Sequence, residues 1–265
     1  MRTMMAALVL AMLAPTGAAA ADRLCDTAYE DCRTPLLALI RDERVGIDVA
    51  FWFMEDARYT AALERKIAEG VPVRVLVDPR ANSSYPLNAD RLQELRDAGI
   101  PMRRRTASGI LHWKMMLFEG QNTVQFSAAH YTSAFVPTTP YENYIDEVIY
   151  FTDDTAVVDS FRTKYDDLWT DETAYGDYAN VTRPLVRRYP LFEKDPEFNF
   201  PPRESYRSRA VRSYDAETIA IDVTMYRITD RAHTDAMIRA LQRGVPVRLI
   251  TEPQQYRDRS RYWHS

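Results

Sequence analysis

The stretch Val45–Leu76, VGIDVAFWFMEDARYTAALERKIAEGVPVRVL, decides the fold of this chain, and it occurs a second time. The second copy is Ile219–Ile250, which lies 174 residues further on, and the two copies share twelve identical residues in thirty-two ungapped positions. The identities include an Ile-Asp-Val triplet near the start and Gly-Val-Pro-Val-Arg near the end. A repeat at this distance predicts two similar half-domains, because each unit is long enough to form a core of its own.

The first copy reads as a strand, a helix and a second strand. Val45–Phe53 is rich in β-branched and aromatic residues, which is typical of a strand buried on both faces. Asp56 is placed to cap the following helix, and Gly70 is placed to end it before a strand at Val71–Val77. A second helix and a short strand follow, at Leu87–Ala98 and Met102–Arg105. This alternation predicts an α/β sandwich with a parallel crossover.

The pattern then changes to closely spaced strands, which we expect at Lys114–Phe118, Thr123–Ser127 and Glu147–Phe151. A helix from Thr152 to Trp169, with Asp153 as its cap, closes the first half-domain, residues 21–169. Residues 170–216 follow neither the helical nor the strand period, and their prolines, tyrosines and arginines indicate a packed connector. The second half-domain begins at residue 217 and is incomplete at residue 265, where only strand, helix and strand have appeared.

The first twenty residues have the order of a cleavable signal peptide. Arg2 precedes an apolar run, Met4–Leu13, and three alanines end the segment at residue 20. The run is too short to span a bilayer, and the alternative is a buried helix or a retained anchor. We therefore expect an exported protein, periplasmic or secreted. The net charge of −4 becomes −5 without Arg2, which excludes a generally basic protein that coats polyanions.

The chain has two cysteines, Cys25 and Cys32, just after the predicted cleavage point. In an oxidising compartment, a pair seven residues apart predicts a small disulfide loop. The alternative is a metal-binding pair, but no nearby histidine or second cysteine pair completes a tetrahedral shell.

His112 and Lys114 follow the first copy of the repeat, and their spacing of two places both side chains on one face of a strand. Glu119 comes next, and the pentapeptide FSAAH follows at residues 126–130. This string resembles the phospholipase D superfamily pattern, in which His-x-Lys is followed by Asp and later by Gly-Ser-x-x-Asn. His112, Lys114 and Ser127 match in register. The departures from the family pattern are Glu119 in place of Asp, Phe126 in place of Gly, and His130 in place of Asn.

The resemblance implies a phospholipase D-like α-β-α sandwich of two similar halves, whose His-x-Lys motifs face each other across one active site. It also implies a phosphodiesterase without metal or cofactor. In such an enzyme, one histidine attacks phosphorus and forms a phosphohistidine, and a second histidine protonates the leaving oxygen and then activates water. Lysines beside the histidines stabilise the charge on the phosphoryl oxygens.

The site residues that the resemblance implies are catalytic His112, Lys114 and Glu147, and phosphate-binding Lys114, Ser127 and His130. His112 is the nucleophile or its general acid–base partner. Glu147 is our candidate for the carboxylate that fixes the imidazole tautomer. Glu119 is expected to support the framework of the motif.

The leading expectation is hydrolysis of a phospholipid headgroup ester, with a membrane surface as a candidate partner. The alternative is an exported nuclease of the same superfamily, because the same chemistry cleaves nucleic-acid phosphodiesters. A local groove of Lys and Arg would favour nucleic acid, and an apolar rim would favour lipid. The offset of 174 predicts a second His-x-Lys motif near position 286, so a chain ending at Ser265 is expected to be inactive by itself. The oligomeric state is left open.

Overall fold

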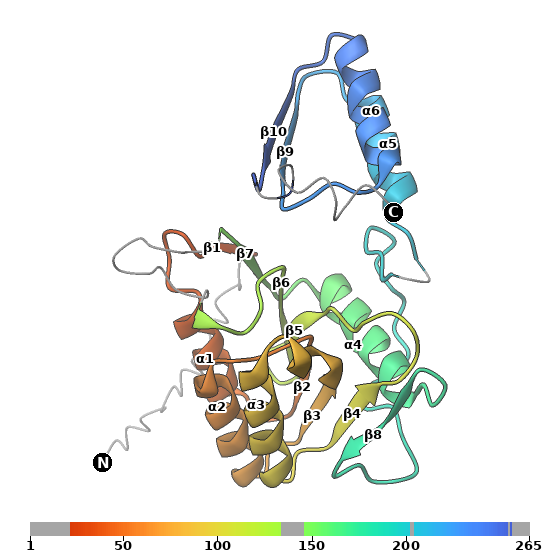
Figure 1. Cartoon of the computed structure of the whole chain (residues 1–265). Coiled ribbons are helices and arrows are strands. Elements are labelled where there is room, and N and C mark those ends of the chain that lie inside the picture. Colours follow the sequence, from red (N-terminus) through yellow and green to blue (C-terminus); the bar gives the residue numbers. More distant parts are fainter. Residues whose placement is uncertain (1–21, 134–145, 202–203, 254, 256–265) are drawn as a thin grey trace, which may run out of the picture. The chain divides into compact units, whose positions relative to one another are not determined.

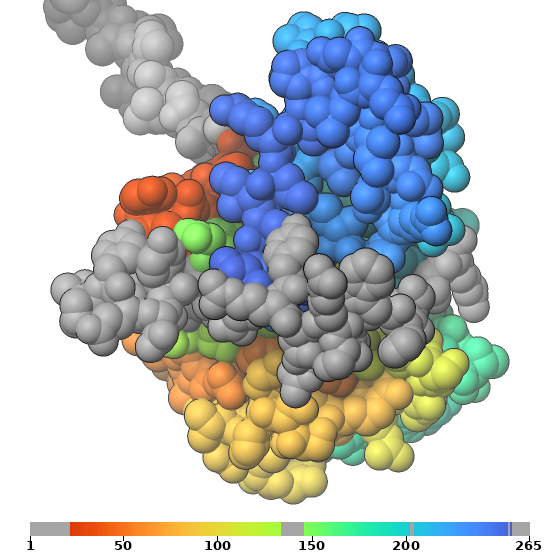
Figure 2. Space-filling view, turned by 45° about the horizontal axis from the view of Figure 1, so that its top comes forward, coloured from red at the N-terminus to blue at the C-terminus, as the bar shows by residue number. Residues whose placement is uncertain are grey.

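The structure is a computed structural model that describes residues 22–133, 146–201, 204–253 and 255. The predicted signal peptide, residues 1–20, lies outside the described residues. The chain forms two compact units, Met1–Asp195 and Pro196–Ser265, and Figure 2 shows the second unit in blue. None of the described helices is long and apolar enough to cross a membrane.

The first unit contains an eight-stranded sheet in the order β1-β7-β6-β5-β2-β3-β4-β8 (Figure 1). Its strands are β1 Arg23–Asp26, β2 Ile47–Phe51, β3 Val73–Val77, β4 Met102–Arg105, β5 Lys114–Phe118, β6 Thr123–Ser127, β7 Val148–Thr152 and β8 Tyr175–Ala179. The strands β2, β3 and β4 are parallel. The other neighbours in the sheet pair antiparallel.

Helices cover both faces of this sheet (Figure 1). They are α1 Arg33–Asp42, α2 Ala57–Ala68, the 3-10 helix η1 Pro79–Ser83, α3 Pro86–Asp97 and α4 Thr155–Thr170. The main core lies between the sheet and the helices α1, α2 and α3, where Leu36, Leu63 and Leu95 pack against alternate residues of β2 and β3. On the other face, the Tyr165 hydroxyl of α4 donates to the backbone oxygen of Val49, 3.2 Å away. The predicted α/β sandwich is confirmed.

Local signals in the sequence account for the helix ends. The Asp56 carboxylate accepts the backbone N–H of Arg58 at the start of α2, and Gly70 follows α2 with φ +83°, a conformation that favours glycine. For α4 the expected cap was wrong by one residue, because Asp154 accepts the N–H groups of Ala156 and Val157.

The structure differs from the sequence interpretation in two edge strands. Strand β8 lies within residues 170–216, which were interpreted as a connector, and it pairs with β4 at one edge of the sheet. Strand β1 pairs with β7 at the other edge. Cys25 of β1 forms a disulfide with Cys32, with an S–S distance of 2.07 Å. Both strands are short, and their residues alternate little between apolar and polar, so their place in the sheet depends on long-range pairing.

The second unit contains four elements whose lengths match elements of the first. They are α5 Arg207–Ala216, β9 Ile221–Met225, α6 Arg231–Gln242 and β10 Val247–Thr251. Each begins 174 residues after its counterpart, which is α1, β2, α2 or β3 respectively. β9 and β10 pair in parallel, and a small core forms around Ile221, Ala240 and Val245.

Candidate active site

The residues of the predicted motif gather at the edge of the central sheet where its strands begin and end, not along the outermost strands β1 and β8. β5 runs antiparallel to β2, and β6 and β7 continue the antiparallel order. The end of β2, the start of β5, the end of β6 and the start of β7 therefore meet at this edge. His112 precedes β5, His130 follows β6 and Glu147 precedes β7. The carboxyl ends of β2 and β3 lie at the same edge, which is where open α/β sheets bind ligands.

His112 and Lys114 are in direct contact. The Lys114 ammonium nitrogen lies 2.9 Å from Nδ1 and 3.1 Å from Nε2 of His112, so it faces the ring between the two nitrogens. The Lys114 side chain is buried, whereas His112 reaches solvent. Desolvation and then the charge of Lys114 lower the pKa of His112 to about 4. The imidazole is therefore neutral near pH 7, which is the form that can attack phosphorus.

Lys114 is itself perturbed by its position as the first residue of β5. Desolvation lowers the pKa of its ammonium group to about 8, and the nearby carboxylate of Glu147 opposes this effect. A lysine with this pKa still carries its charge near neutral pH, and its charge is screened little because water is excluded. The pair of groups thus combines a neutral imidazole with a buried cation.

Glu147 lies within electrostatic reach of Lys114. Burial raises the pKa of the Glu147 carboxyl and Lys114 lowers it. In the part of the chain that the structure describes, the carboxylate makes no hydrogen bond to His112. The backbone of Glu147 is fixed by Thr27, because the Thr27 N–H and hydroxyl both donate to the Glu147 carbonyl at 3.1 Å. Glu147 thus interacts electrostatically with Lys114, and it makes no direct contact of this kind with His112.

His130 lies beside His112 and is part of a stack of rings. The two imidazole centroids are 5.2 Å apart, with the rings nearly perpendicular. Phe53 lies between His130 and Tyr85, with ring centroids 3.9 Å and 3.6 Å away. Desolvation, together with Lys114 and His112, lowers the pKa of His130 to about 3. Among the described residues, His130 Nδ1 is buried without a hydrogen-bond partner.

Ser127 shapes the turn that carries His130. Its hydroxyl donates to the Ala129 carbonyl at 2.8 Å. Two residues further on, the Tyr131 carbonyl accepts the backbone N–H groups of Glu55 and Asp56, at 2.9 Å and 3.1 Å. These bonds tie the segment after β6 to the segment after β2, which explains why Phe53 and His130 stack.

Sequence reasoning missed Asp78 and Arg80, which hold the segment before His112. The Asp78 carboxylate is buried and accepts the Leu111 N–H at 3.2 Å. Arg80 pairs with Asp78 and donates to the Gly109 carbonyl at 2.6 Å. The available signal was the position of Asp78, directly after the buried strand β3 and at the same edge of the sheet as His112.

Two aromatic residues after β2 were also missed. Phe53 stacks on His130, and the Trp52 ring centroid lies 6.4 Å from that of His112. Adjacent residues after one strand thus contact both histidines. The sequence shows a pair of large aromatic residues at the end of a buried strand, but it does not show that they contact the two histidines.

Glu119 lies at the opposite end of β5 from His112. The two positions are seven apart along an extended chain, which corresponds to roughly 20 Å. The Glu119 backbone N–H donates to the Gly46 carbonyl at 3.0 Å. Burial raises the pKa of its carboxyl, which Arg188 opposes. The side chain therefore lies among framework residues.

Within the ranges that the structure describes, no group of three or more His, Cys, Asp or Glu residues is arranged to hold a metal ion.

Comparisons with known proteins show the family and the fold of the chain. A family model described as cardiolipin synthase, PLD-like domain, matches residues 36–169, which is half of the chain. No curated protein matches the chain.

Several solved structures share the fold. Phosphatidylserine synthase from Haemophilus influenzae Rd KW20 aligns with a TM-score of 0.63 and 16% identity, over 87% of this chain and 61% of that one. The phospholipase D family member Nuc from Salmonella typhimurium aligns with a TM-score of 0.50 and 19% identity, over 60% of this chain and 98% of that one. Polyphosphate kinase from Porphyromonas gingivalis aligns with a TM-score of 0.55 and 17% identity, over 87% of this chain and 38% of that one. By its matched residues and its fold, the chain belongs to the phospholipase D-like family.

Proposed function

We propose that this protein is an exported phosphodiesterase that acts on a phospholipid headgroup ester through a phosphohistidine at His112. The observation that carries the proposal is the contact of a neutral, solvent-accessible imidazole with a buried lysine, at 2.9 Å between Lys114 Nζ and His112 Nδ1. Family membership supports the reaction class, and the Cys25–Cys32 disulfide supports an oxidising compartment.

In the proposed reaction, a ring nitrogen of His112 attacks phosphorus. The N–P bond forms as the bond between phosphorus and the headgroup oxygen breaks. Lys114 stabilises the negative charge on the non-bridging oxygens. His130 donates a hydrogen bond from Nε2 to the phosphoryl group, as the family asparagine would, and the Ser127 hydroxyl can turn from Ala129 to do the same. Water then displaces His112 and restores the free imidazole.

The leaving oxygen requires a proton from a general acid other than the nucleophile His112. The resemblance assigns this role to the histidine of a second His-x-Lys motif. With one motif alone, we expect the first step to need a leaving group that departs without a proton, and complete turnover of ordinary esters to be very slow. An association of two copies could instead bring two motifs together.

Two exposed apolar residues close in sequence to site residues support a lipid substrate. Leu87 is 53% exposed and Ile110 is 52% exposed. In the sequence, Leu87 lies two residues after Tyr85, and Ile110 lies two residues before His112. Lys114 is the cation in contact with His112. Exposed apolar side chains fit a bilayer interface better than a polyanion. Nucleic acid is the alternative outcome of the experiment below.

The test uses bis(p-nitrophenyl) phosphate, because nitrophenolate leaves without general acid help. Residues 21–265 should release about one equivalent of nitrophenolate in a burst and form a phosphoryl adduct on His112, detected by mass spectrometry of the peptide. His112→Asn should give neither. Phosphatidylglycerol vesicles should compete with the burst better than a single-stranded oligonucleotide, and the reverse order would favour the nuclease. The absence of both burst and adduct in the wild-type chain would refute the proposal.

A further inference from the structure

Thr27 holds the backbone of Glu147 through both of its polar groups. The Thr27 N–H and hydroxyl each donate to the Glu147 carbonyl at 3.1 Å, and the hydroxyl oxygen also accepts the Glu147 N–H at 3.2 Å. Thr27 is buried, so water does not readily replace these bonds. A buried threonine therefore fixes the backbone of the residue that supplies the predicted catalytic carboxylate.

Thr27 belongs to a loop that a disulfide closes. Cys25 lies in β1 and Cys32 directly precedes α1, and the disulfide joins them over a sequence separation of 7. Both cysteines are fully buried. Within the loop, the Asp26 carbonyl accepts the N–H of Glu30 at 2.9 Å. Because a closed loop has fewer conformations open to it, the disulfide restricts the positions that Thr27 can take.

The far end of this loop is anchored in the core of the first unit. Arg33, the first residue of α1, donates to the Asp56 carboxylate at 3.1 Å, and Asp56 also caps α2. Leu36 and Ile40 of α1 are fully buried. By contrast, β1 is the outermost strand, and in the described sheet it pairs with β7 alone. The disulfide therefore connects a short edge strand, which has few contacts of its own, to a well-packed helix.

Glu147 is the charged group that this loop brings to the candidate active site. Desolvation lowers the pKa of Lys114 to about 8, and the Glu147 carboxylate opposes this effect. The other titratable groups that the structure describes beside Lys114 are His112 and His130, and both are neutral near pH 7 because their pKa values are lowered to about 4 and about 3. Since the attraction between charges weakens with distance, a displaced Glu147 would leave Lys114 with a still lower pKa.

We propose that Thr27 is a positioning residue for the active site, and that the Cys25–Cys32 disulfide makes it effective by anchoring its loop to α1. The loop holds the Glu147 carboxylate beside Lys114, and Lys114 thereby keeps the charge that stabilises the phosphoryl oxygens. Thr27 acts through Glu147 and needs no contact with substrate. The consequence for catalysis rests on the proposed function, whereas the placement of Glu147 beside Lys114 can be measured without any reaction.

The test measures the pKa of Lys114 by NMR, in residues 21–265 labelled with carbon-13 at the lysine ε-carbon. The chain has four lysines, and Lys114→Arg assigns the signal. Thr27→Val keeps the shape of the side chain but removes the hydroxyl, so the pKa of Lys114 should fall by about 0.5 or more. Thr27→Ser restores the hydroxyl and should keep the wild-type value. Cys25→Ala combined with Cys32→Ala opens the loop and should lower the pKa in the same direction.

The matched control is Thr34→Val. Thr34 lies just beyond the loop, and its hydroxyl donates to the exposed Asp31 carboxylate at 2.7 Å, so its loss should leave the pKa of Lys114 unchanged. In a Glu147→Gln chain, Thr27→Val should have no further effect on Lys114, because both changes act through the same carboxylate. Circular dichroism checks that each variant remains folded, and Thr27→Ala takes the place of Thr27→Val if the valine variant does not fold.

The nitrophenolate burst measures the consequence for catalysis. The burst rate of Thr27→Val should fall more at pH 8 than at pH 6, because Lys114 loses its charge at a lower pH in this variant. A wild-type chain without a burst would count against the proposed function alone. A Lys114 pKa that is unchanged by Thr27→Val, or that falls equally in the Glu147→Gln chain, would overturn the positioning role.

Discussion

The carboxylate of Asp78 accepts the backbone N–H of Leu111 at 3.2 Å, and it thereby holds the residue directly before His112. Asp78 follows β3 and Leu111 leads into β5, so the contact crosses β2, which lies between these two strands in the sheet. The carboxylate also pairs with Arg80, which binds the Gly109 carbonyl. The segment that carries His112 is thus fixed at two backbone positions by side chains of one turn.

Asp78→Ala should lower the rate of the nitrophenolate burst about 10²-fold, because small displacements of a reacting group can cost that much. It also leaves the buried Leu111 N–H without a partner, which costs about 1–3 kcal/mol of stability. Asp78→Asn keeps an acceptor for Leu111 and should retain more of the rate. Stopped-flow absorbance measures the burst. Equal rates for the two variants would contradict a positioning role.

The pH profile should report His112 and Lys114. The lowered pKa of His112, about 4, keeps the nucleophile neutral well below pH 6.5, so the burst rate should fall only as the pH drops through about 4. The lowered pKa of Lys114, about 8, means that the clamp loses its charge as the pH rises through about 8. We expect a plateau between these values. Lys114→Arg stays charged, so its profile should lack the alkaline limb, whatever its absolute rate.

Phe53 should control the ionisation of His130. Phe53→Leu exposes one face of the imidazole to water, which relieves desolvation, and the pKa of His130 should rise from about 3. Nitrogen-15 NMR of the ring measures the titration without any need for activity. Tyr85→Leu is the control, since Tyr85 lies 6.4 Å from His130 on the far side of Phe53. An unchanged His130 titration in Phe53→Leu would argue against this role.

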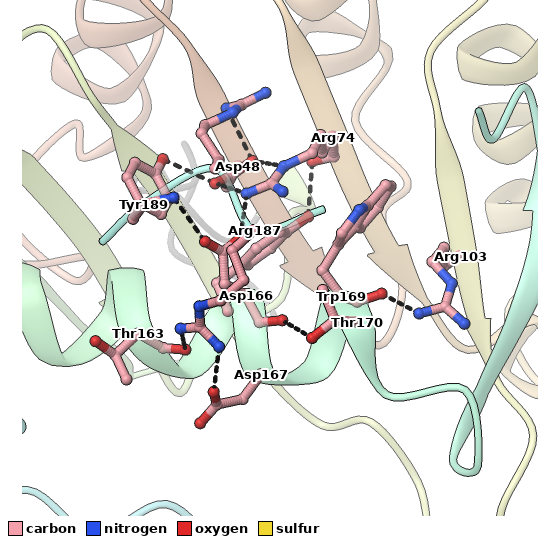
Figure 3. Close-up of polar contacts among 12 residues, drawn as sticks. Asp48, Arg74, Arg103, Thr163, Asp166, Asp167, Trp169, Thr170, Arg187 and Tyr189 are labelled. Carbon is pink, nitrogen blue, oxygen red and sulfur yellow. Dashed lines mark hydrogen bonds and ion pairs between the residues drawn. The ribbon is translucent and has the colours of Figure 1, made fainter. Parts of the chain in front are cut away.

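The buried network in which Asp48 and Asp166 both bind Arg74 (Figure 3) should dominate the stability of the first unit. Arg74→Met leaves the carboxylates of Asp48 and Asp166 buried and without their shared cation, and it should cost about 3–5 kcal/mol. In the second unit, the repeat pairs Asp222 with Arg248 on exposed side chains. Arg248→Met removes this exposed copy of the pair and should cost less than about 1 kcal/mol. Urea unfolding followed by circular dichroism compares them, because helices of both units contribute to the signal. Similar losses for both variants would contradict the assigned difference in environment.

Much of the framework was predictable because its signals are local. Asp56 and Gly70 mark the ends of α2, and the buried strands β2, β3 and β5 read as apolar runs. The spacing of His112 and Lys114 placed both at the start of β5. These features depend on neighbouring residues in the chain, and a sequence records such neighbours directly.

The tertiary structure alone decided which side chains meet. Phe53 reaches His130, and Asp78 reaches Leu111, across segments 77 and 33 residues apart in the chain, which no local pattern encodes. It also decided that β8 joins the sheet. The clearest case is the repeated pair itself: Asp48–Arg74 and Asp222–Arg248 have the same sequence context, yet α4 covers only the first. Burial, and with it the strength of an ion pair, is a property of what packs around it rather than of the residues that form it.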